Sequence, residues 1–151
     1  MISFVFYSFV NYYPINCIQC IKKKYLQGLP ELDVLVLSDN PLEELNVDWS
    51  QFPKLREIYA NNCKLDVKSF NESFFQSSSF RRLSFENNQI HSIDRLLKLR
   101  GLVILHMRKN ESVKVDQRLL DSHESLNLLD IRDNPIKLEL NLKNENIKIM
   151  N

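Results

Sequence analysis

The sequence predicts an α/β solenoid, in which short parallel strands form one face of a curved stack and helical or irregular arcs form the other. Two observations support this prediction: an apolar pattern recurs at nearly constant intervals, and an asparagine follows nearly every copy of it. A unit this short cannot bury its own apolar face. Neighbouring copies therefore have to stack and share one continuous core.

The apolar pattern has five copies that follow one another along the chain. They start at Leu32, Leu55, Phe80, Leu102 and Leu126, with steps of 23, 25, 22 and 24 residues. Each copy also carries two apolar residues at alternating positions, as expected for a strand that buries one face and exposes the other. The predicted buried pairs are Leu35/Leu37, Ile58/Ala60, Leu83/Phe85, Leu105/Met107 and Leu129/Ile131.

Each predicted strand ends in a turn, and the turns share one column of residues: Asn40, Cys63, Asn88, Asn110 and Asn134. A buried turn leaves backbone N–H and C=O groups without partners, which is costly. An asparagine amide has both donors and an acceptor, so a column of asparagines can satisfy successive turns. We expect Cys63 to take the same place with a weaker donor.

The segments between the predicted strands differ in composition, so we expect arcs of different kinds. The first contains Pro41, Trp49 and Pro53, which favour an extended or 3₁₀ conformation, with Trp49 packed in the core. The second has apolar residues at helical spacing, with Ser69 as a candidate N-cap. The third, 90–101, predicts one or two helical turns.

The N-terminal residues 1–28 do not follow the pattern, and we expect an N-terminal cap or a degenerate repeat there. A repeat in frame would place Pro14 in a strand, where proline cannot donate a hydrogen bond. A helix that ends near Gly28 is therefore favoured, and a fragment without its upstream repeats is the alternative. The apolar first ten residues lack the basic region and the cleavage site of a signal peptide.

The C-terminal end of the repeat region, 29–142, has a different pattern. Residues 136–142 alternate between apolar and polar side chains, which predicts a closing strand that caps the solenoid. The last residues, 143–151, are mostly polar, and we expect them to form a frayed tail.

Five copies of the frame LxxLxLxxNxL, over about residues 29–140, resemble the leucine-rich-repeat family. The resemblance implies a right-handed solenoid whose concave face carries the parallel sheet, and a non-catalytic role as a protein–protein interaction scaffold. The third copy and the end of the fifth look like those of intracellular members, so we expect a cytoplasmic or nuclear protein. The alternative is that the chain is the recognition segment of a larger enzyme or receptor.

Composition argues against several other classes of function. The formal net charge is +1, so no overall field favours binding to nucleic acid. The single pair Cys17-x-x-Cys20 lacks the further ligands that a zinc site needs. No apolar run approaches the roughly 18 residues of a membrane span, and no nucleotide-binding or hydrolase motif is present. We therefore expect a monomer without metal, cofactor, catalytic site or membrane span.

The repeat frame also predicts which side chains line the concave face. Apolar residues stand where polar ones would suffice: Val34, Val36, Tyr59, Ile104 and Leu128. Basic residues cluster in the middle copies: Arg56, Arg81, Arg82, Arg108 and Lys109. We expect a partner protein with apolar and acidic features, and a sheet face of mixed composition without a partner is the alternative. The candidate contact residues are Val36, Glu57, Tyr59, Arg82, Ser84, Glu86, His106, Arg108, Asp130 and Arg132.

Overall fold

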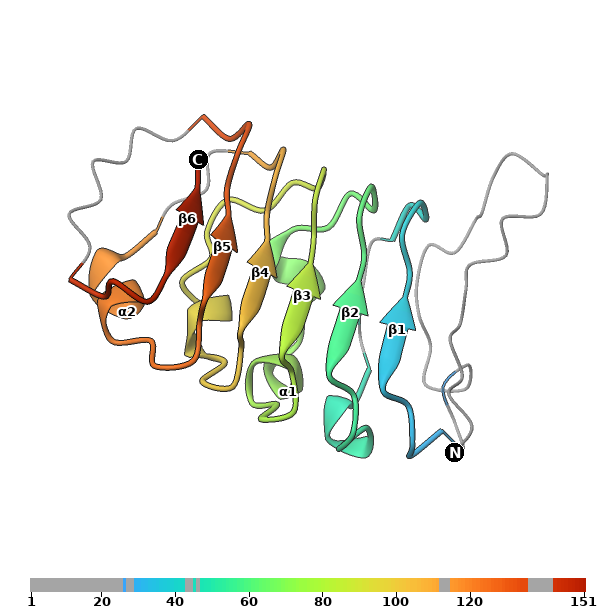
Figure 1. Ribbon diagram of the computed structural model, residues 1–151. Coiled ribbons are helices and arrows are strands. Elements are labelled where there is room, and N and C mark those ends of the chain that lie inside the picture. Colours follow the sequence, from blue (N-terminus) through green and yellow to red (C-terminus); the bar gives the residue numbers. More distant parts are fainter. Residues whose placement is uncertain (1–25, 27–28, 43–44, 46, 112–114, 136–142) are drawn as a thin grey trace.

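The computed structural model of the protein describes residues 26, 29–42, 45, 47–111, 115–135 and 143–151. These residues form one parallel sheet of six strands, whose order in the sheet is their order along the chain (Figure 1). The strands are β1 (Val34–Val36), β2 (Glu57–Tyr59), β3 (Arg82–Ser84), β4 (Ile104–His106), β5 (Leu128–Asp130) and β6 (Lys148–Met150). The predicted solenoid with a parallel sheet is therefore confirmed.

The strands form because the sequence alternates with a period of two residues, which places one apolar side chain of each strand in the core. The central residues of the first five strands are fully buried, and they align across the sheet without a slip. These residues are Leu35, Ile58, Leu83, Leu105 and Leu129. A shift of one residue would turn every core side chain towards solvent, so the register is fixed by burial.

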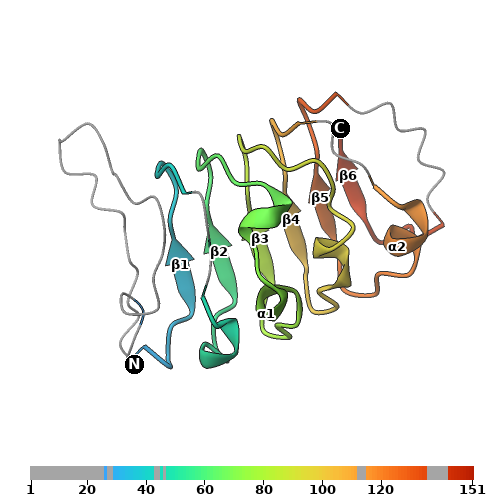
Figure 2. The same cartoon turned by 180° about the vertical axis from the view of Figure 1, so that it is seen from behind.

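The arcs are short helical segments behind the sheet, and Figure 2 shows them covering its rear face. They are η2 (Trp49–Gln51), η3 (Val67–Ser69), α1 (Glu72–Phe75), η4 (Leu96–Lys98) and α2 (Gln117–Asp121). The predicted 3₁₀ conformation around Trp49 and the helical turn within 90–101 are both present.

The predicted N-cap at Ser69 was wrong. Asp66 caps η3 instead, and the hydroxyl of Ser69 accepts the N–H of Asp66 in return, at 3.1 Å. This reciprocal pair is a capping box, in which the N-cap residue and the third residue of the helix each satisfy a backbone N–H of the other. Asn71 then caps α1 by accepting the N–H of Phe74 at 3.2 Å.

Aromatic side chains fill the core between the sheet and the first two arcs, which carry η2 and α1. Trp49 is buried, as predicted, and its ring lies edge-on to Phe74, with ring centroids 5.2 Å apart. Phe74 also contacts Phe80, at 4.9 Å between centroids. Such pairs are favourable beyond their buried area because the ring edge and the ring face carry opposite partial charges.

The asparagine column satisfies the buried turns as predicted. Asn88 donates from Nδ2 to the carbonyl of Ala60 at 2.8 Å, and its Oδ1 accepts the N–H groups of Cys63 at 3.1 Å and of Leu65 at 2.9 Å. Each of these bonds joins the turn of one repeat to the turn before it. Asn110 and Asn134 make equivalent bonds to the preceding turns.

Cys63 occupies the same column with a weaker donor, as predicted. Its Sγ lies 3.3 Å from the carbonyl of Leu37. Burial raises the pKa of the Cys63 thiol to about 11, so the sulfur keeps its proton and can donate it. The other two cysteines, Cys17 and Cys20, lie outside the described residues.

The expectation of a frayed tail was wrong. The segment 143–151 contains β6, which pairs with β5 and aligns Ile149 with Leu129. The predicted closing strand at 136–142 stays a prediction. The segments 136–142, 1–25 and 27–28 lie outside the described residues.

Candidate protein-interaction surface

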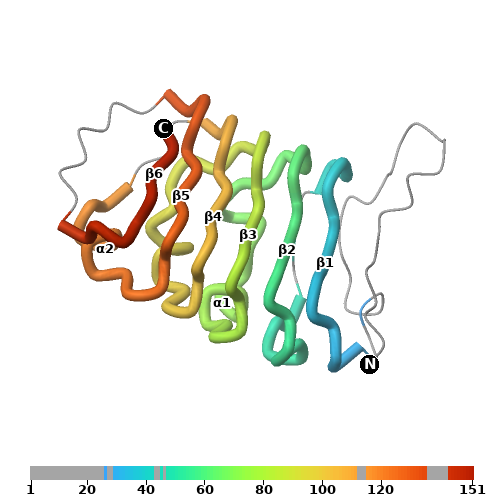
Figure 3. Tube along the Cα trace, viewed as in Figure 1, coloured from blue at the N-terminus to red at the C-terminus, as the bar shows by residue number. Residues whose placement is uncertain are grey.

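The outward side chains of the six strands form two rows across the concave face. Because the strands are parallel and in register, side chains at equal positions lie beside one another, as the Cα trace in Figure 3 shows for the strands themselves. The first row is Val34, Glu57, Arg82, Ile104, Leu128 and Lys148. The second row is Val36, Tyr59, Ser84, His106, Asp130 and Met150.

Three predicted contact residues on β2 and β3 form one hydrogen-bonded group. The hydroxyl of Tyr59 donates to Glu57 Oε2 at 2.6 Å, and Arg82 Nη1 donates to the Tyr59 oxygen at 3.2 Å. Partial burial and the bond to Glu57 raise the pKa of Tyr59, which keeps its proton in place. The phenol ring is therefore held in one orientation on the concave face.

A second charged group lies on β4 and β5. Arg132 holds the carboxylate of Asp130 with two hydrogen bonds, 2.9 Å from Nε and 2.7 Å from Nη2. Burial raises the pKa of Asp130, but the hydrogen bonds from Arg132 outweigh this effect and lower the pKa overall. His106 Nδ1 lies 3.8 Å from the same carboxylate, so its ring stands beside a permanent negative charge.

Two of the predicted contact residues are not exposed. Asp130 is only 2% exposed because Arg132 covers it, and Ser84 is 3% exposed because its hydroxyl donates to Asn61 Oδ1 at 2.9 Å. The strand alternation correctly places both side chains on the outward face. Both are buried by neighbouring polar side chains, so their contact with a partner stays a prediction.

Apolar side chains lie on both sides of the charged group on β2 and β3. Val34 and Val36 on β1 are half-buried, and so are Ile104 on β4 and Leu128 on β5. Ile104 and Leu128 are direct neighbours in the sheet. The concave face therefore has two apolar flanks, one on β1 and one on β4 and β5, with the group of Glu57, Tyr59 and Arg82 between them.

Most of the basic side chains of the middle repeats already have partners within the protein. Arg56 forms two hydrogen bonds with Asp33, of 2.7 and 2.9 Å, and Arg81 Nη1 donates to three backbone carbonyls. Arg82 is bound to Tyr59, and Arg108 Nε donates to a carboxylate of the next turn at 2.7 Å. Among the basic residues singled out in the sequence, only Lys109 has no side-chain partner in the described part of the chain.

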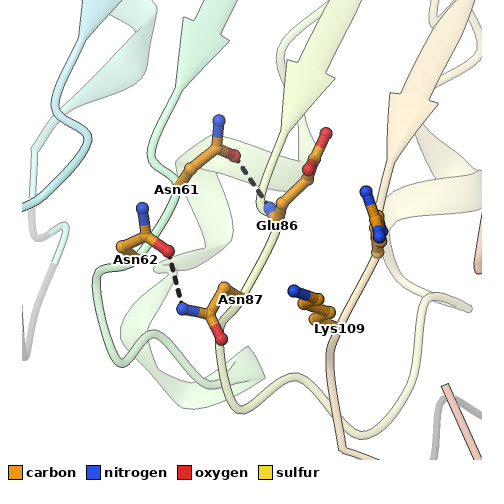
Figure 4. A pocket seen from close by; sticks show the side chains of 6 residues that line it. Asn61, Asn62, Glu86, Asn87 and Lys109 are labelled. Carbon is orange, nitrogen blue, oxygen red and sulfur yellow. Dashed lines mark hydrogen bonds between the residues drawn. The ribbon is translucent and has the colours of Figure 1, made fainter. Parts of the chain in front are cut away.

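A polar pocket of about 210 Å³ lies beside the concave face, where the turns follow β2, β3 and β4. Its lining residues are Asn61, Asn62, Glu86, Asn87, Arg108 and Lys109 (Figure 4). Glu86 and Arg108 were among the predicted contact residues, and the structure brings them together here. Asn62 and Asn87 were not predicted as surface residues. The signal was present, because the residue directly before the asparagine column is polar in every copy.

Among the described residues, no group of three or more histidine, cysteine, aspartate or glutamate side chains could hold a metal ion. In the same part of the chain, no helix has the length and apolar character needed to cross a membrane.

The repeated strand and turn, the asparagine column and the single parallel sheet define a leucine-rich-repeat protein, and the chain is one. It is 32% identical to podocan of Mus musculus over 110 residues, which are 72% of this chain and 18% of podocan. It is 29% identical to osteomodulin of Rattus norvegicus over 105 residues, which are 70% of this chain and 24% of osteomodulin. The chain thus spans less than a quarter of either relative's length, and no family model matches it.

Solved structures share the fold. Internalin C2 of Listeria monocytogenes superposes with a TM-score of 0.69 and 19% identity, covering 85% of this chain and 55% of that protein. InlP of the same organism gives a TM-score of 0.57 and 20% identity, covering 76% of this chain and 31% of that protein.

The expectation of a cytoplasmic or nuclear protein was wrong. Podocan and osteomodulin are extracellular matrix proteins. The expectation rested on short stretches of two repeats that look like those of intracellular members. Such stretches report the local shape of an arc, which leucine-rich-repeat proteins of several compartments can share.

Proposed function

We propose that this protein is a non-catalytic scaffold that binds a partner protein on its concave face. Leucine-rich-repeat proteins generally mediate protein–protein interaction. The observation that carries the proposal is the pair of apolar flanks, Val34 with Val36 and Ile104 with Leu128, on the outward side of the sheet. Side chains that serve only the sheet need not be apolar there, and burying them in a partner is favourable.

The charged groups of the concave face support the same proposal because their side chains are already ordered. Tyr59 is fixed by Glu57 and Arg82, and Arg132 is fixed by Asp130. A partner that contacts them loses little conformational entropy of these side chains, and tyrosine and arginine are frequent anchors of interfaces. We assign the contacts to Val36, Glu57, Tyr59, Arg82, Glu86, His106, Arg108 and Arg132, with Ser84 and Asp130 as supporting residues behind them.

A cross-linking experiment tests which face is used. A photoreactive phenylalanine analogue replaces Ile104 on the concave face, or Lys98, which is exposed on η4 on the convex side. Partners are captured from the native source and identified by mass spectrometry. We expect a specific partner to cross-link reproducibly at position 104 and not at position 98. Cross-linking only at position 98 would rule out the concave face.

A matched pair of variants measures the contribution of the apolar flank to binding. Ile104→Asn combined with Leu128→Asn removes the apolar pair of β4 and β5, and we expect affinity for the captured partner to fall at least about tenfold. The control Lys98→Asn introduces the same residue on the convex side and should leave affinity unchanged. The free energy of unfolding of each variant, measured in urea, separates lost contacts from lost folding.

A further inference from the structure

We propose that the polar pocket on the turns after β2, β3 and β4 binds a carboxylate side chain, aspartate or glutamate, of the partner protein. This proposal rests on the proposed function and adds a second site to it. The apolar part of the partner lies on the strands, and its acidic residue reaches the adjoining turns.

The pocket holds a cation that has no partner in the part of the chain that the structure describes. The arginines on the strands and at their ends are bound to Asp33, Tyr59 and Asp130 or to backbone carbonyls. The ammonium of Lys109 has no hydrogen-bond or ion-pair partner among the described residues. Over β1 to β5, an acidic residue of the partner would therefore have to break an existing pair of an arginine, whereas it finds a free cation in the pocket.

The hydrogen-bonding groups of the pocket that have no partner are mainly donors. Arg108 binds Asp133 through Nε, and its two terminal nitrogens have no partner among the described residues. Asn61 uses Oδ1 to accept from Ser84 and from the N–H of Glu86, and its Nδ2 has no partner in the same part of the chain. With the three donors of Lys109, the free groups are mainly N–H donors, and a carboxylate supplies only acceptors.

The carboxylate of Glu86 also lines the pocket, and its position is compatible with an anionic ligand. Figure 4 shows this carboxylate pointing away from Lys109, while the backbone N–H of Glu86 is bound to Asn61. The pKa of Arg132 is raised, mainly by its hydrogen bond to Asp130 and in smaller part by the negative charge of Glu86.

The backbone of Lys109 has a positive φ, which is unusual for lysine. Its φ is 54°, and the equivalent residues of the other four copies, which share a positive φ, are Asp39, Asn62, Asn87 and Asp133. Asparagine and aspartate tolerate this conformation, whereas lysine has no local hydrogen bond that compensates for it. Lysine at this position is unfavourable for the fold, which is expected where a side chain serves a ligand.

A neighbouring hollow extends the positive surface along the turns. It has a volume of about 460 Å³, shares Asn62, Asn87 and Lys109 with the pocket, and adds Lys64. Glu111, which also lines it, lies 3.7 Å from His91. A partner that approaches along the strands therefore meets Lys109 at the border of the concave face and Lys64 beyond it.

The test uses the full chain, labelled with ¹⁵N, and a hexaglutamate peptide with blocked ends as the probe. At low ionic strength we expect the peptide to shift the side-chain amide resonances of Asn61 and Asn87 and the backbone resonance of Lys109. A hexaglutamine peptide of equal length should leave them in place. Lys109→Asn should weaken the binding of hexaglutamate about fivefold, and Lys98→Asn removes the same charge on the convex side and should not.

Three results would overturn the proposal: no shift at Asn61 and Asn87, equal binding of hexaglutamine, or an equal loss of affinity in Lys98→Asn. Lys109→Asn is a safe variant because asparagine already stands at this turn position in two other copies. The experiment does not involve the partner or the apolar flank. Its failure would therefore leave the cross-linking test of the concave face unaffected, and failure of that test would leave this measurement valid.

Discussion

Two ladders of polar side chains run side by side along the turns, and they differ in burial. The inner ladder is the asparagine column, and its members Asn40, Asn88 and Asn110 are buried and bonded to backbone groups. The outer ladder stands one residue earlier in each turn, at the positions with positive φ. It joins Asp39 to Asn62 at 2.8 Å, and Asn62 to Asn87 at 2.6 Å, through exposed side chains.

Asparagine therefore has a different structural role on each of the two ladders. An inner amide replaces water for groups that water cannot reach, so its loss leaves buried donors and acceptors without partners. An outer amide competes with water, and its main value is that asparagine tolerates a positive φ. The outer ladder can therefore change residue type at a lower cost than the inner one, and at Lys109 it carries a lysine.

The largest effect is expected on the inner ladder, from Asn88→Ala. The N–H groups of Cys63 and Leu65 lose their acceptor and the carbonyl of Ala60 loses a donor. We expect the free energy of unfolding to fall by about 3 kcal/mol or more, since each unsatisfied buried group costs about 1–3 kcal/mol. Urea denaturation measures the change, and a loss below about 1 kcal/mol would show that the column is not obligatory.

A pH-dependent effect is expected at His123, a buried polar group of the convex side. Its Nδ1 accepts the N–H of Leu126 at 3.1 Å and its Nε2 lies 3.2 Å from the carbonyl of Leu99, which requires a neutral ring. Burial lowers the pKa of His123 below its ordinary value of 6.5. The unfolded chain therefore binds this proton first, and stability should fall as the pH drops below about 6.5.

The slope should reach at most about 1.4 kcal/mol per pH unit, the value for one proton. Urea denaturation at several pH values between about 7.5 and 5.5 measures it. In His123→Gln the part of the slope that comes from this ring should disappear. If the slope is the same in the variant, another group is responsible for it.

A smaller effect is expected on the outer ladder, from Asn87→Ala. Alanine loses the exposed hydrogen bond to Asn62 and is strained at a φ of 52°. We expect a loss of about 1 kcal/mol in the free energy of unfolding. Asn87→Gly keeps the backbone conformation without strain, so it should cost less than the alanine variant. The reverse order would mean that the side-chain bond matters more than the backbone.

The smallest effect, and the only gain, is expected from Lys109→Asn. Asparagine tolerates the positive φ, and its amide could continue the outer ladder from Asn87. We expect the free energy of unfolding to rise by about 0.5 kcal/mol, measured by urea denaturation against Lys98→Asn as a control. A loss of stability would show that Lys109 serves the fold itself.

Most of the fold could be predicted from the sequence because its period encodes both burial and register. The five central strand residues from Leu35 to Leu129, the core position of Trp49 and the role of Cys63 in the asparagine column all followed from the pattern. β6 was missed because only Ile147 and Ile149 alternate there within a mostly polar segment. So short an alternation does not distinguish a strand from a tail.

The surface could be predicted less well, because strand alternation assigns a face and not an exposure. Asp130 and Ser84 point outward, yet Arg132 and Asn61 cover them. The charge of a surface has the same limitation, since a count of arginines does not show which of them are already paired. The pocket beside Lys109 depends on residues from three repeats, and no single copy of the pattern contains it.

The aromatic core provides the protein with an optical reporter. Trp49 is the only tryptophan of the chain, and it is buried among Phe52, Phe74 and Phe80. Its fluorescence should be blue-shifted in the folded protein and should move to longer wavelength when water reaches the ring. Because a repeat contacts mainly its neighbours, this emission reports on the repeats around η2 and α1, and far-ultraviolet circular dichroism reports on the whole solenoid. If unfolding begins at one end, the two signals will separate along a denaturant titration.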